Sequence, residues 1–314
     1  MALIGHDDAI KALKAAFAGG RPHHGWLVTG PMGIGKASLA EAAAIWLLAG
    51  RPEGPGFEGA VHSQAAALVA AGSHPDFRRL VRTEADNGKL RSVIRVDEVR
   101  ALQAVLNQTP SLSPWRVIIV DSADDLNPNA ANALLKSLEE PPQQTIFFLI
   151  SHAPGRLLPT IRSRCRVLRL QPLTDAQVSQ VLDAHDTGLS AADEAALVQI
   201  AGGSPGTALR FAEPGIAELE TGLAALPAGG QAAALALARS LTGKAASARY
   251  EAFLERVPAL LAQAARHQRG PRLERTLDDW RDAMKLAASA GPLTLDPHMV
   301  AHELAMKLVR AHQP

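Results

Sequence analysis

The chain has 314 residues, of which 47% are hydrophobic and 20% charged, and its formal net charge is +1 at pH 7. This length allows two or three domains, and the composition permits hydrophobic cores and is typical of a soluble globular protein. The nearly neutral balance argues against a dominant nucleic-acid-binding surface, because phosphate contacts usually require a basic excess, and leaves only a local basic patch open.

Cysteine usage and the N-terminal residues bear on the compartment. Cys165 is the only cysteine, so the chain has no internal disulfide partner for it, which fits a reducing cytoplasm. The first residues lack the basic stretch and apolar run of a signal peptide, and we expect no stretch that is apolar for long enough to span a bilayer. The sequence therefore predicts a cytoplasmic protein without a membrane partner.

The first half of the chain alternates apolar strands with helices. We expect strands at 26–28, 77–81, 117–120 and 145–150, and helices at 9–17, about 39–48, 64–71, 97–106 and 128–138. The strands are nearly continuous apolar runs, which indicates a buried parallel sheet flanked by helices.

After Leu170 the sequence becomes rich in Ala and Leu with helical spacing. Capping signals mark helix starts at Thr174 with Gln177, at Ser190 with Asp193 and at Asp296 with Pro297. We therefore expect three domains, an α/β nucleotide-binding core at 1–169, a small helical domain at 170–212 and an all-α bundle at 213–314.

A glycine-rich loop follows the first strand and opens a helix, which is the setting of a Walker A phosphate-binding loop. The candidate phosphate-binding residues are Gly30, Gly33, Gly35, Lys36 and Ser38. Glycines let backbone N–H groups turn toward phosphates, and the lysine adds a positive charge. The next position normally offers a hydroxyl to Mg²⁺, but here it is Ala37, which has no oxygen.

The second half of such a site is an acidic residue at the end of another apolar strand, and Asp121 fits that position. The next residue, Ser122, cannot polarise the attacking water as a glutamate does at neutral pH. The pair Asp97-Glu98 is an alternative base, but a solvated helix start with Asp97 as its cap explains it better.

Two further motifs follow the loop, Asn-Ala-Leu-Leu-Lys-Ser-Leu-Glu-Glu-Pro-Pro at 132–142 and Ser163-Arg164-Cys165. Together they make the chain resemble the clamp-loader branch of the AAA+ ATPases. The resemblance is dense over 25–166 and weaker at 202–206, and towards the C-terminus only the helical character agrees. It implies an AAA+ core, a helical lid and a collar bundle that mediates oligomerisation.

The resemblance also implies partners. Loaders of the bacterial DNA polymerase III holoenzyme are pentameric rings of gamma/tau ATPase subunits, a delta subunit and a non-hydrolysing stator, and they open the sliding clamp and close it on primed DNA. Ser122 after Asp121, together with His74-Pro75-Asp76, favours the stator over a gamma/tau subunit. We therefore expect contacts with gamma/tau and delta, and indirect contacts with the clamp and DNA at the replisome.

The same resemblance assigns a catalytic position to Arg164. The matching arginine of the family enters a neighbouring subunit's ATP site in trans as an arginine finger, which stabilises the transferring phosphate. A structural salt bridge is the alternative interpretation of Arg164. Arg162 is expected to point elsewhere from an extended segment.

Two departures from the family define the cofactor expectation. The four zinc-binding cysteines of many relatives are missing between Leu48 and His74, so we expect no zinc. Gly206 stands where active relatives carry a nucleotide-sensing arginine. Since the loop glycines and Lys36 remain, the sequence allows ATP or ADP binding without hydrolysis, with no cofactor required and no metal held.

Other functions stay open as alternatives. An autonomous AAA+ ATPase of the gamma/tau type is the first, and Ala37 and Ser122 argue against it. A P-loop nucleotide kinase is the second, and it needs neither the helical C-terminal half nor Ser163-Arg164-Cys165. We expect a subunit without ATPase activity of its own inside a DNA-directed DNA polymerase holoenzyme.

Overall fold

The computed structural model describes residues 3–19, 22–84, 88, 90–106, 108–212 and 215–313. The chain divides into two compact units. Unit 1 comprises Met1–Gln177 with Gly203–Gly206, and unit 2 comprises Val178–Gly202 with Thr207–Pro314. Unit 1 contains the expected core, and the division of the remainder into a lid and a collar stays a prediction.

Unit 1 is built on a five-stranded parallel sheet with the order β2-β3-β4-β1-β5. The strands are β1 (Gly25–Thr29), β2 (Phe77–Leu80), β3 (Arg116–Val120), β4 (Thr145–Ser151) and β5 (Arg166–Arg169). Every residue of the three inner strands is buried, which confirms the parallel sheet predicted from continuous apolar runs. The edge strand β5 was not predicted, because its exposed arginines interrupt the apolar pattern.

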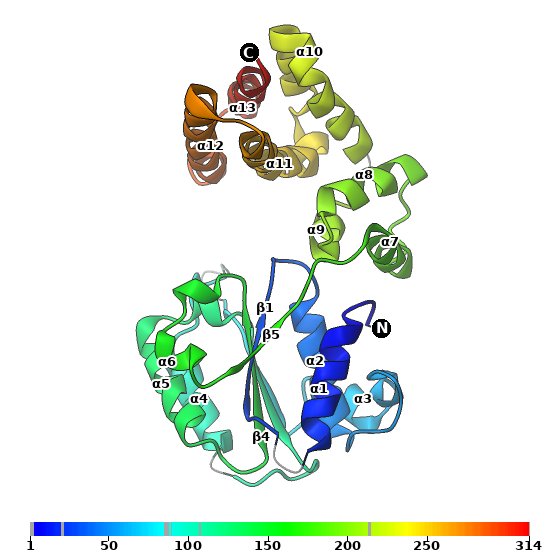
Figure 1. Ribbon diagram of the computed structural model, residues 1–314, viewed down its shortest axis with the longest axis vertical. Helices are drawn as coiled ribbons and strands as arrows, with labels where there is room; N and C mark the ends of the chain where they lie inside the picture. The colour runs from blue at the N-terminus through cyan, green and yellow to red at the C-terminus, as the bar shows by residue number, and fades with distance from the viewer. Residues whose placement is uncertain are drawn as a thin grey trace. The chain divides into compact units, whose positions relative to one another are not determined.

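Helices cover both faces of this sheet (Figure 1). One face carries α1 (Asp7–Ala18), α2 (Lys36–Leu48) and α3 (Gln64–Ala70), and the other carries α4 (Val96–Leu106), α5 (Pro128–Glu139) and α6 (Pro159–Arg162). On the first face the ring of Phe17 lies 6.1 Å from those of Trp26 and Trp46 and 6.3 Å from that of Trp115. The helices packed on the two faces fix the positions of the strand ends, where the predicted phosphate-binding loop lies.

Three helix starts differ from their predicted positions. α1 begins at Asp7 instead of Ala9. α2 begins at Lys36 instead of near Leu39, because the loop glycines lead directly into the first helical turn. α4 begins at Val96, so Asp97 lies in the first turn and is not the cap. The carboxylate of Glu98 instead accepts a hydrogen bond of 2.5 Å from the backbone N–H of Arg95.

The His74-Pro75-Asp76 motif ties β2 to the loop before β3. The buried Asp76 carboxylate accepts hydrogen bonds from the backbone N–H groups of Ser111, Leu112 and Ser113 at 2.8, 2.8 and 2.9 Å. Burial by itself raises the pKa of Asp76, but these hydrogen bonds outweigh it and hold the pKa below its ordinary value. The motif is therefore a structural anchor for the sheet.

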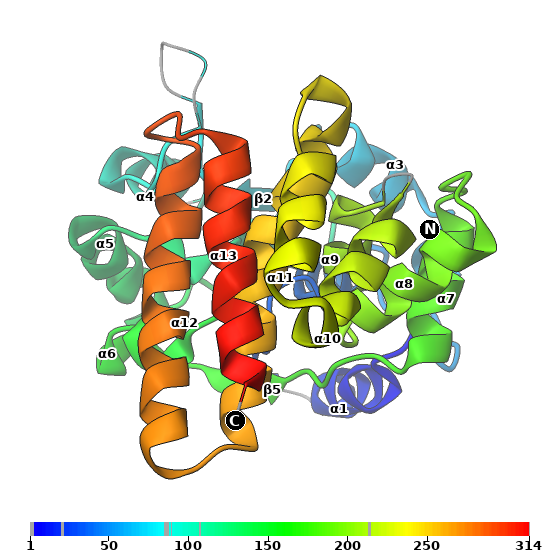
Figure 2. The ribbon, with the colours of Figure 1, turned by 90° about the horizontal axis from the view of Figure 1, so that it is seen from above.

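Unit 2 is helical. Its helices are the greater parts of α7 (Asp175–Ala184) and α9 (Pro205–Arg210), and all of α8 (Ala191–Ala201), α10 (Ile216–Ser240), α11 (Ser247–Arg266), α12 (Gly270–Ala290) and α13 (Pro297–His312). The last four pack as a bundle in which α12 and α13 lie side by side (Figure 2). The predicted caps are confirmed, since Ser190 accepts from the N–H of Asp193 and Asp296 from that of Met299.

By length and composition alone, α10 is apolar enough to cross a membrane, so the expectation of no such stretch is wrong by that criterion. The helix is interrupted, however, because Gly230 has non-helical torsion angles (φ 56°, ψ −141°) three residues after Pro227. Its buried leucines, including Leu219 and Leu226, belong to a helix that packs against α13. In this structure α10 is part of the bundle.

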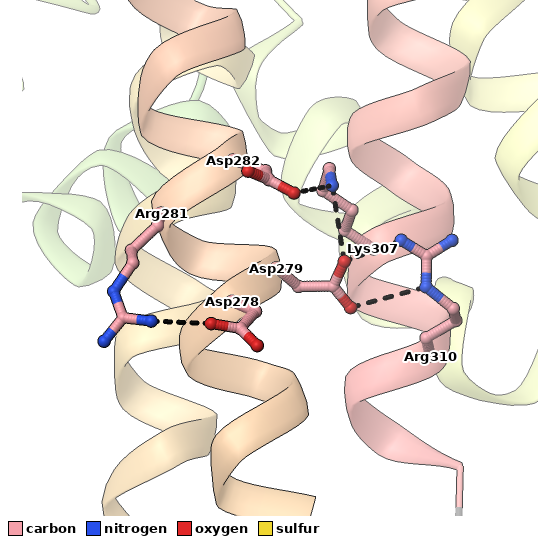
Figure 3. A network of polar contacts seen from close by, with 6 residues as sticks. All are labelled: Asp278, Asp279, Arg281, Asp282, Lys307 and Arg310. Carbon is pink, nitrogen blue, oxygen red and sulfur yellow. Dashed lines mark hydrogen bonds and ion pairs between the residues drawn. The ribbon is translucent and has the colours of Figure 1, made fainter.

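An ion-pair network joins α12 to α13 (Figure 3). Asp279 accepts from Lys307 at 3.3 Å and from Arg310 at 2.7 Å, and Asp282 lies 3.6 Å from Lys307. The side chains of Asp279 and Lys307 are only 16% and 7% exposed. Asp278 pairs with Arg281 on the solvated side of α12, where both are largely exposed. Solvent therefore screens the second pair much more than the first.

We expect Asp76→Ala to lower the free energy of unfolding of unit 1 by about 3 kcal/mol, because three backbone N–H groups, that of the buried Ser113 among them, lose a buried charged acceptor. Since the folded pKa of Asp76 is depressed, this stability is present above the ordinary aspartate pKa and is lost as pH falls through the folded value. Urea titrations at neutral and acidic pH measure both effects. The exposed Asp97→Ala is the control, and an equal loss there contradicts the assignment.

We expect Asp279→Ala to cost about 3 kcal/mol, because it leaves the buried Lys307 without its nearer carboxylate. Its sequence neighbour Asp278→Ala removes the same charge from an exposed pair and should cost less than about 1 kcal/mol. Denaturant unfolding of the two variants measures the difference. Equal costs would show that the network adds nothing to the bundle.

Candidate nucleotide site and arginine finger

The phosphate-binding loop lies between β1 and α2, as predicted. Gly30, Gly33 and Gly35 have φ values of 146°, 79° and 97°, which side-chain-bearing residues rarely adopt. At Gly30 a Cβ atom would also stand 2.9 Å from the carbonyl oxygen of Leu170. The structure brings the three glycines and Lys36 together at the start of α2, with Ser38 exposed in its first turn.

Lys36 is folded back onto its own loop. Its side chain is buried, and Nζ donates to the carbonyl oxygens of Gly30 at 2.8 Å and Pro31 at 2.5 Å. Burial lowers the pKa of Lys36 to about 8, although the charges of Asp124 and Asp121 oppose the shift. In this conformation the ammonium group is satisfied by the loop itself.

Two residues outside the Walker pattern hold the loop. The ring Nε2 of His6 lies 2.7 Å from the carbonyl oxygen of Ile34. The backbone N–H of Gly206 donates to the carbonyl oxygen of Gly33 at 2.8 Å, and a Cβ atom at Gly206 would lie 2.9 Å from the Cα of Gly33. In this conformation any side chain at Gly206 would clash with the backbone of the loop.

The metal position does not suit a divalent cation. Ala37 offers no hydroxyl, and Asp121 is bound by Arg79, whose Nη2 lies 2.6 Å from Oδ2. The other guanidinium nitrogen of Arg79, Nη1, lies 3.0 Å from Oε2 of Glu41 on α2. Mg²⁺ needs a nearly octahedral set of oxygen ligands. The carboxylate of Asp121, which is the predicted ligand, is already paired with a guanidinium. Sequence reasoning missed Arg79, because its register on β2 is fixed only by the sheet.

Asp124 is a second residue that sequence reasoning did not assign. Its carboxylate accepts hydrogen bonds from the hydroxyl of Ser151 at 2.8 Å and from the backbone N–H groups of His152 and Ala153 at 2.6 and 3.3 Å. These bonds join the end of β3 to the end of β4. The signal available in the sequence was an aspartate three positions after Asp121.

Among the residues that the structure describes, no group of three or more His, Cys, Asp or Glu side chains is placed to hold a metal ion. Asp97 and Glu98, the alternative base pair, are engaged instead at the start of α4, where Asp97 faces Arg95 and Arg100.

Arg164 lies just after α6, half exposed at the surface of unit 1. Its guanidinium binds Glu139 of the 132–142 motif at 2.8 Å and the carbonyl oxygen of Thr160 at 2.9 Å. The predicted extended segment around Arg162 is wrong, since Pro159–Arg162 forms a helical turn that the proline starts. Arg162 nevertheless points elsewhere, into a groove of about 800 Å³ that Arg169 and His152 also line.

Cys165 is the free cysteine between two arginines. Its side chain is buried against β1, where a Cβ atom on Gly25 would lie 3.2 Å from its Sγ. Burial raises the pKa of the Cys165 thiol to about 12. The thiol is therefore a packed, unreactive group.

Comparison with known proteins identifies the family. A family model described as "DNA polymerase III, delta subunit" matches residues 5–174, more than half of the chain. The chain belongs to this family. A DNA polymerase III subunit delta-prime of Pseudomonas aeruginosa is 44% identical to it over 212 residues, which are 66% of this chain and 62% of that protein.

A second relative is the DNA polymerase III subunit delta-prime of Escherichia coli K12. It is 38% identical over 197 residues, which are 63% of this chain and 57% of that protein. The matched part thus spans less than two thirds of either relative. At the level of the family, the predicted resemblance to subunits of DNA polymerase III is confirmed.

A solved structure supports the fold of this delta-subunit family member. A DNA polymerase III gamma subunit-related protein of Thermotoga maritima superposes with a TM-score of 0.51 at 15% identity, covering 98% of this chain and all of that one. At this identity the likeness bears on the fold alone. It agrees with the predicted α/β core followed by C-terminal helices.

We expect Cys165 to react with a thiol reagent such as dithionitrobenzoate at least a hundredfold more slowly in the native protein than in urea, since thiolate is the reactive form. Absorbance at pH 8 follows the reaction of this single thiol. Rapid labelling of the native protein would contradict the burial of Cys165 and its raised pKa.

Proposed function

We propose that this chain is the delta-prime subunit of a bacterial clamp loader, a non-hydrolysing stator of the DNA polymerase III holoenzyme. Its partners are the gamma/tau ATPase subunits and the delta subunit, and through them the sliding clamp and primed DNA. The proposal includes a cytoplasmic location at the replisome. The relatives that carry the delta-prime name support it.

The observation that carries the proposal is a nucleotide site that lacks catalytic groups. The same chain carries the family's Ser163-Arg164-Cys165 motif, with Arg164 at the surface. Ala37, Ser122 and Gly206 each lack a group that hydrolysis uses, and Arg79 occupies Asp121. Removing one such group commonly slows a reaction on the order of a hundredfold or more. Three missing groups argue that this chain's chemistry occurs in a neighbour.

We assign Arg164 of this chain a role in the ATP site of that neighbour. In the isolated chain, Glu139 and the Thr160 carbonyl hold the guanidinium near the surface and satisfy its charge. Entry into a phosphate site exchanges this single carboxylate for a more highly charged partner, which favours the exchange. The phosphate-binding loop retains its glycines and Lys36, so we include ATP or ADP binding without turnover in the proposal.

An autonomous gamma/tau-type ATPase is the second candidate, and the intact loop with Lys36 is the observation in its favour. A steady-state ATPase assay of the isolated chain separates the two. If the chain is the stator, its ATP turnover should stay at background, and Lys36→Ala should not change it. Robust turnover that depends on Lys36 would overturn it.

We expect Arg164→Ala to leave this chain folded and assembled but to reduce ATP hydrolysis by the reconstituted loader. Losing an arginine finger slows hydrolysis at the affected site on the order of a thousandfold, so the loader loses that site's share of turnover. Arg164→Lys should recover little, because an ammonium group lacks the guanidinium fork.

The matched control is Arg156→Ala, which removes an exposed arginine from the 154–156 turn of the same unit. Gel filtration of each reconstituted loader monitors assembly. Unchanged loader turnover with Arg164→Ala, together with normal assembly, refutes the finger assignment.

A further inference from the structure

The charged groups around the phosphate-binding loop are paired in an unusual way for a P-loop site. Where β3 ends and α2 begins, Asp121, Asp124 and Glu41 supply negative charge, and Lys36 and Arg79 supply positive charge. Arg162 and Arg169 line a groove with Gly30 and Pro31 of the same loop. Asp124 is committed to Ser151, His152 and Ala153. The two remaining carboxylates converge on one cation, the guanidinium of Arg79.

We propose that Arg79 takes the place of the divalent metal in this site. Its guanidinium bridges Asp121 at the end of β3 and Glu41 on α2, with N–O distances of 2.6 and 3.0 Å. This proposal deepens the proposed function and rests on it only for the absence of ATP hydrolysis. What it predicts is how the isolated chain binds cations.

Register and charge both carry this assignment. Arg79 pairs with Ile119 across the parallel ladder, so its side chain lies on the face of the sheet that Ile119 shares with α2. From there the planar fork reaches two carboxylates on different elements, which suits arginine better than lysine. A second cation placed against Asp121 meets the repulsion of Arg79 at close range.

The ligand count points the same way. A P-loop metal takes a hydroxyl from the position of Ala37 and an acidic residue at the position of Asp121. The first has no oxygen, and the second already makes a short charge-assisted hydrogen bond. Arg79 thus gives Asp121 a permanent counter-ion, and any phosphate ligand at this loop is bound without a metal.

Mn²⁺ is the probe for a test on the full-length isolated chain, because its paramagnetic resonance signal reports the free ion. Wild-type protein and Asp121→Asn should bind Mn²⁺ equally weakly. Arg79→Gln frees Asp121 and Glu41, and its Mn²⁺ affinity should rise about tenfold or more. The double variant Arg79→Gln/Asp121→Asn should lose that gain.

Arg82→Gln is the matched control. Arg82 is also partly exposed and lies 3.3 Å from Asp125, so the variant removes the same charge from a nearby pair and leaves Asp121 bound. It should bind Mn²⁺ as weakly as the wild type. Circular dichroism and thermal melting confirm that each variant is folded.

Three results overturn the proposal. The first is a Mn²⁺ site in the wild type that Asp121→Asn abolishes, a comparison that holds even if Arg79→Gln does not fold. The others are a folded Arg79→Gln that binds no more tightly than Arg82→Gln, and a gain that survives Asp121→Asn. Failure of the loader experiments would leave these outcomes unchanged, so the two proposals fail separately.

Discussion

The burial of the parallel sheet on both faces is the constraint on which unit 1 depends. Helices cover each face, so polar side chains are placed where strands end. The carboxyl ends of β1, β3 and β4 meet at one edge and bring together the loop with Lys36, then Asp121 and Asp124, and then Ser151. The same packing exposes β5, after the turn that carries Arg164.

This edge has the geometry of a nucleotide site, yet its charges are satisfied internally. Lys36 binds the carbonyl groups of its own loop, Asp124 binds the end of β4, and Arg79 binds Asp121. Each interaction replaces one that a phosphate, a metal or water would otherwise make. The site is therefore held together by the groups that an active ATPase keeps available, which agrees with a fold retained as a scaffold.

Outside this edge, two further features matter, the surface arginine Arg164 and the contacts that tie the elements of each unit together. Arg164 follows a short helix started by Pro159 and is oriented by Glu139, a residue of the motif that precedes β4. The Asp76 anchor in unit 1 and the α12–α13 network in unit 2 each tie elements together, the first through a buried carboxylate and the second through a largely buried one. In the proposed function, a well-packed unit 1 keeps Arg164 in place, because a displaced guanidinium loses most of its effect.

The sequence by itself determined the inner strands, most helices, the phosphate-binding loop and the family, because these depend on local periodicity, glycine torsions and contiguous motifs. It missed β5, because exposed arginines interrupt the apolar pattern of that edge strand. It also placed the start of α2 near Leu39 instead of at Lys36 and took Asp97 as the cap of α4. Only the tertiary structure decided that Arg79 neutralises Asp121, that Gly206 contacts Gly33 and that Glu139 holds Arg164. These pairs lie far apart in the chain, and the register of the sheet and the packing of its helices, which no local pattern encodes, bring them into contact.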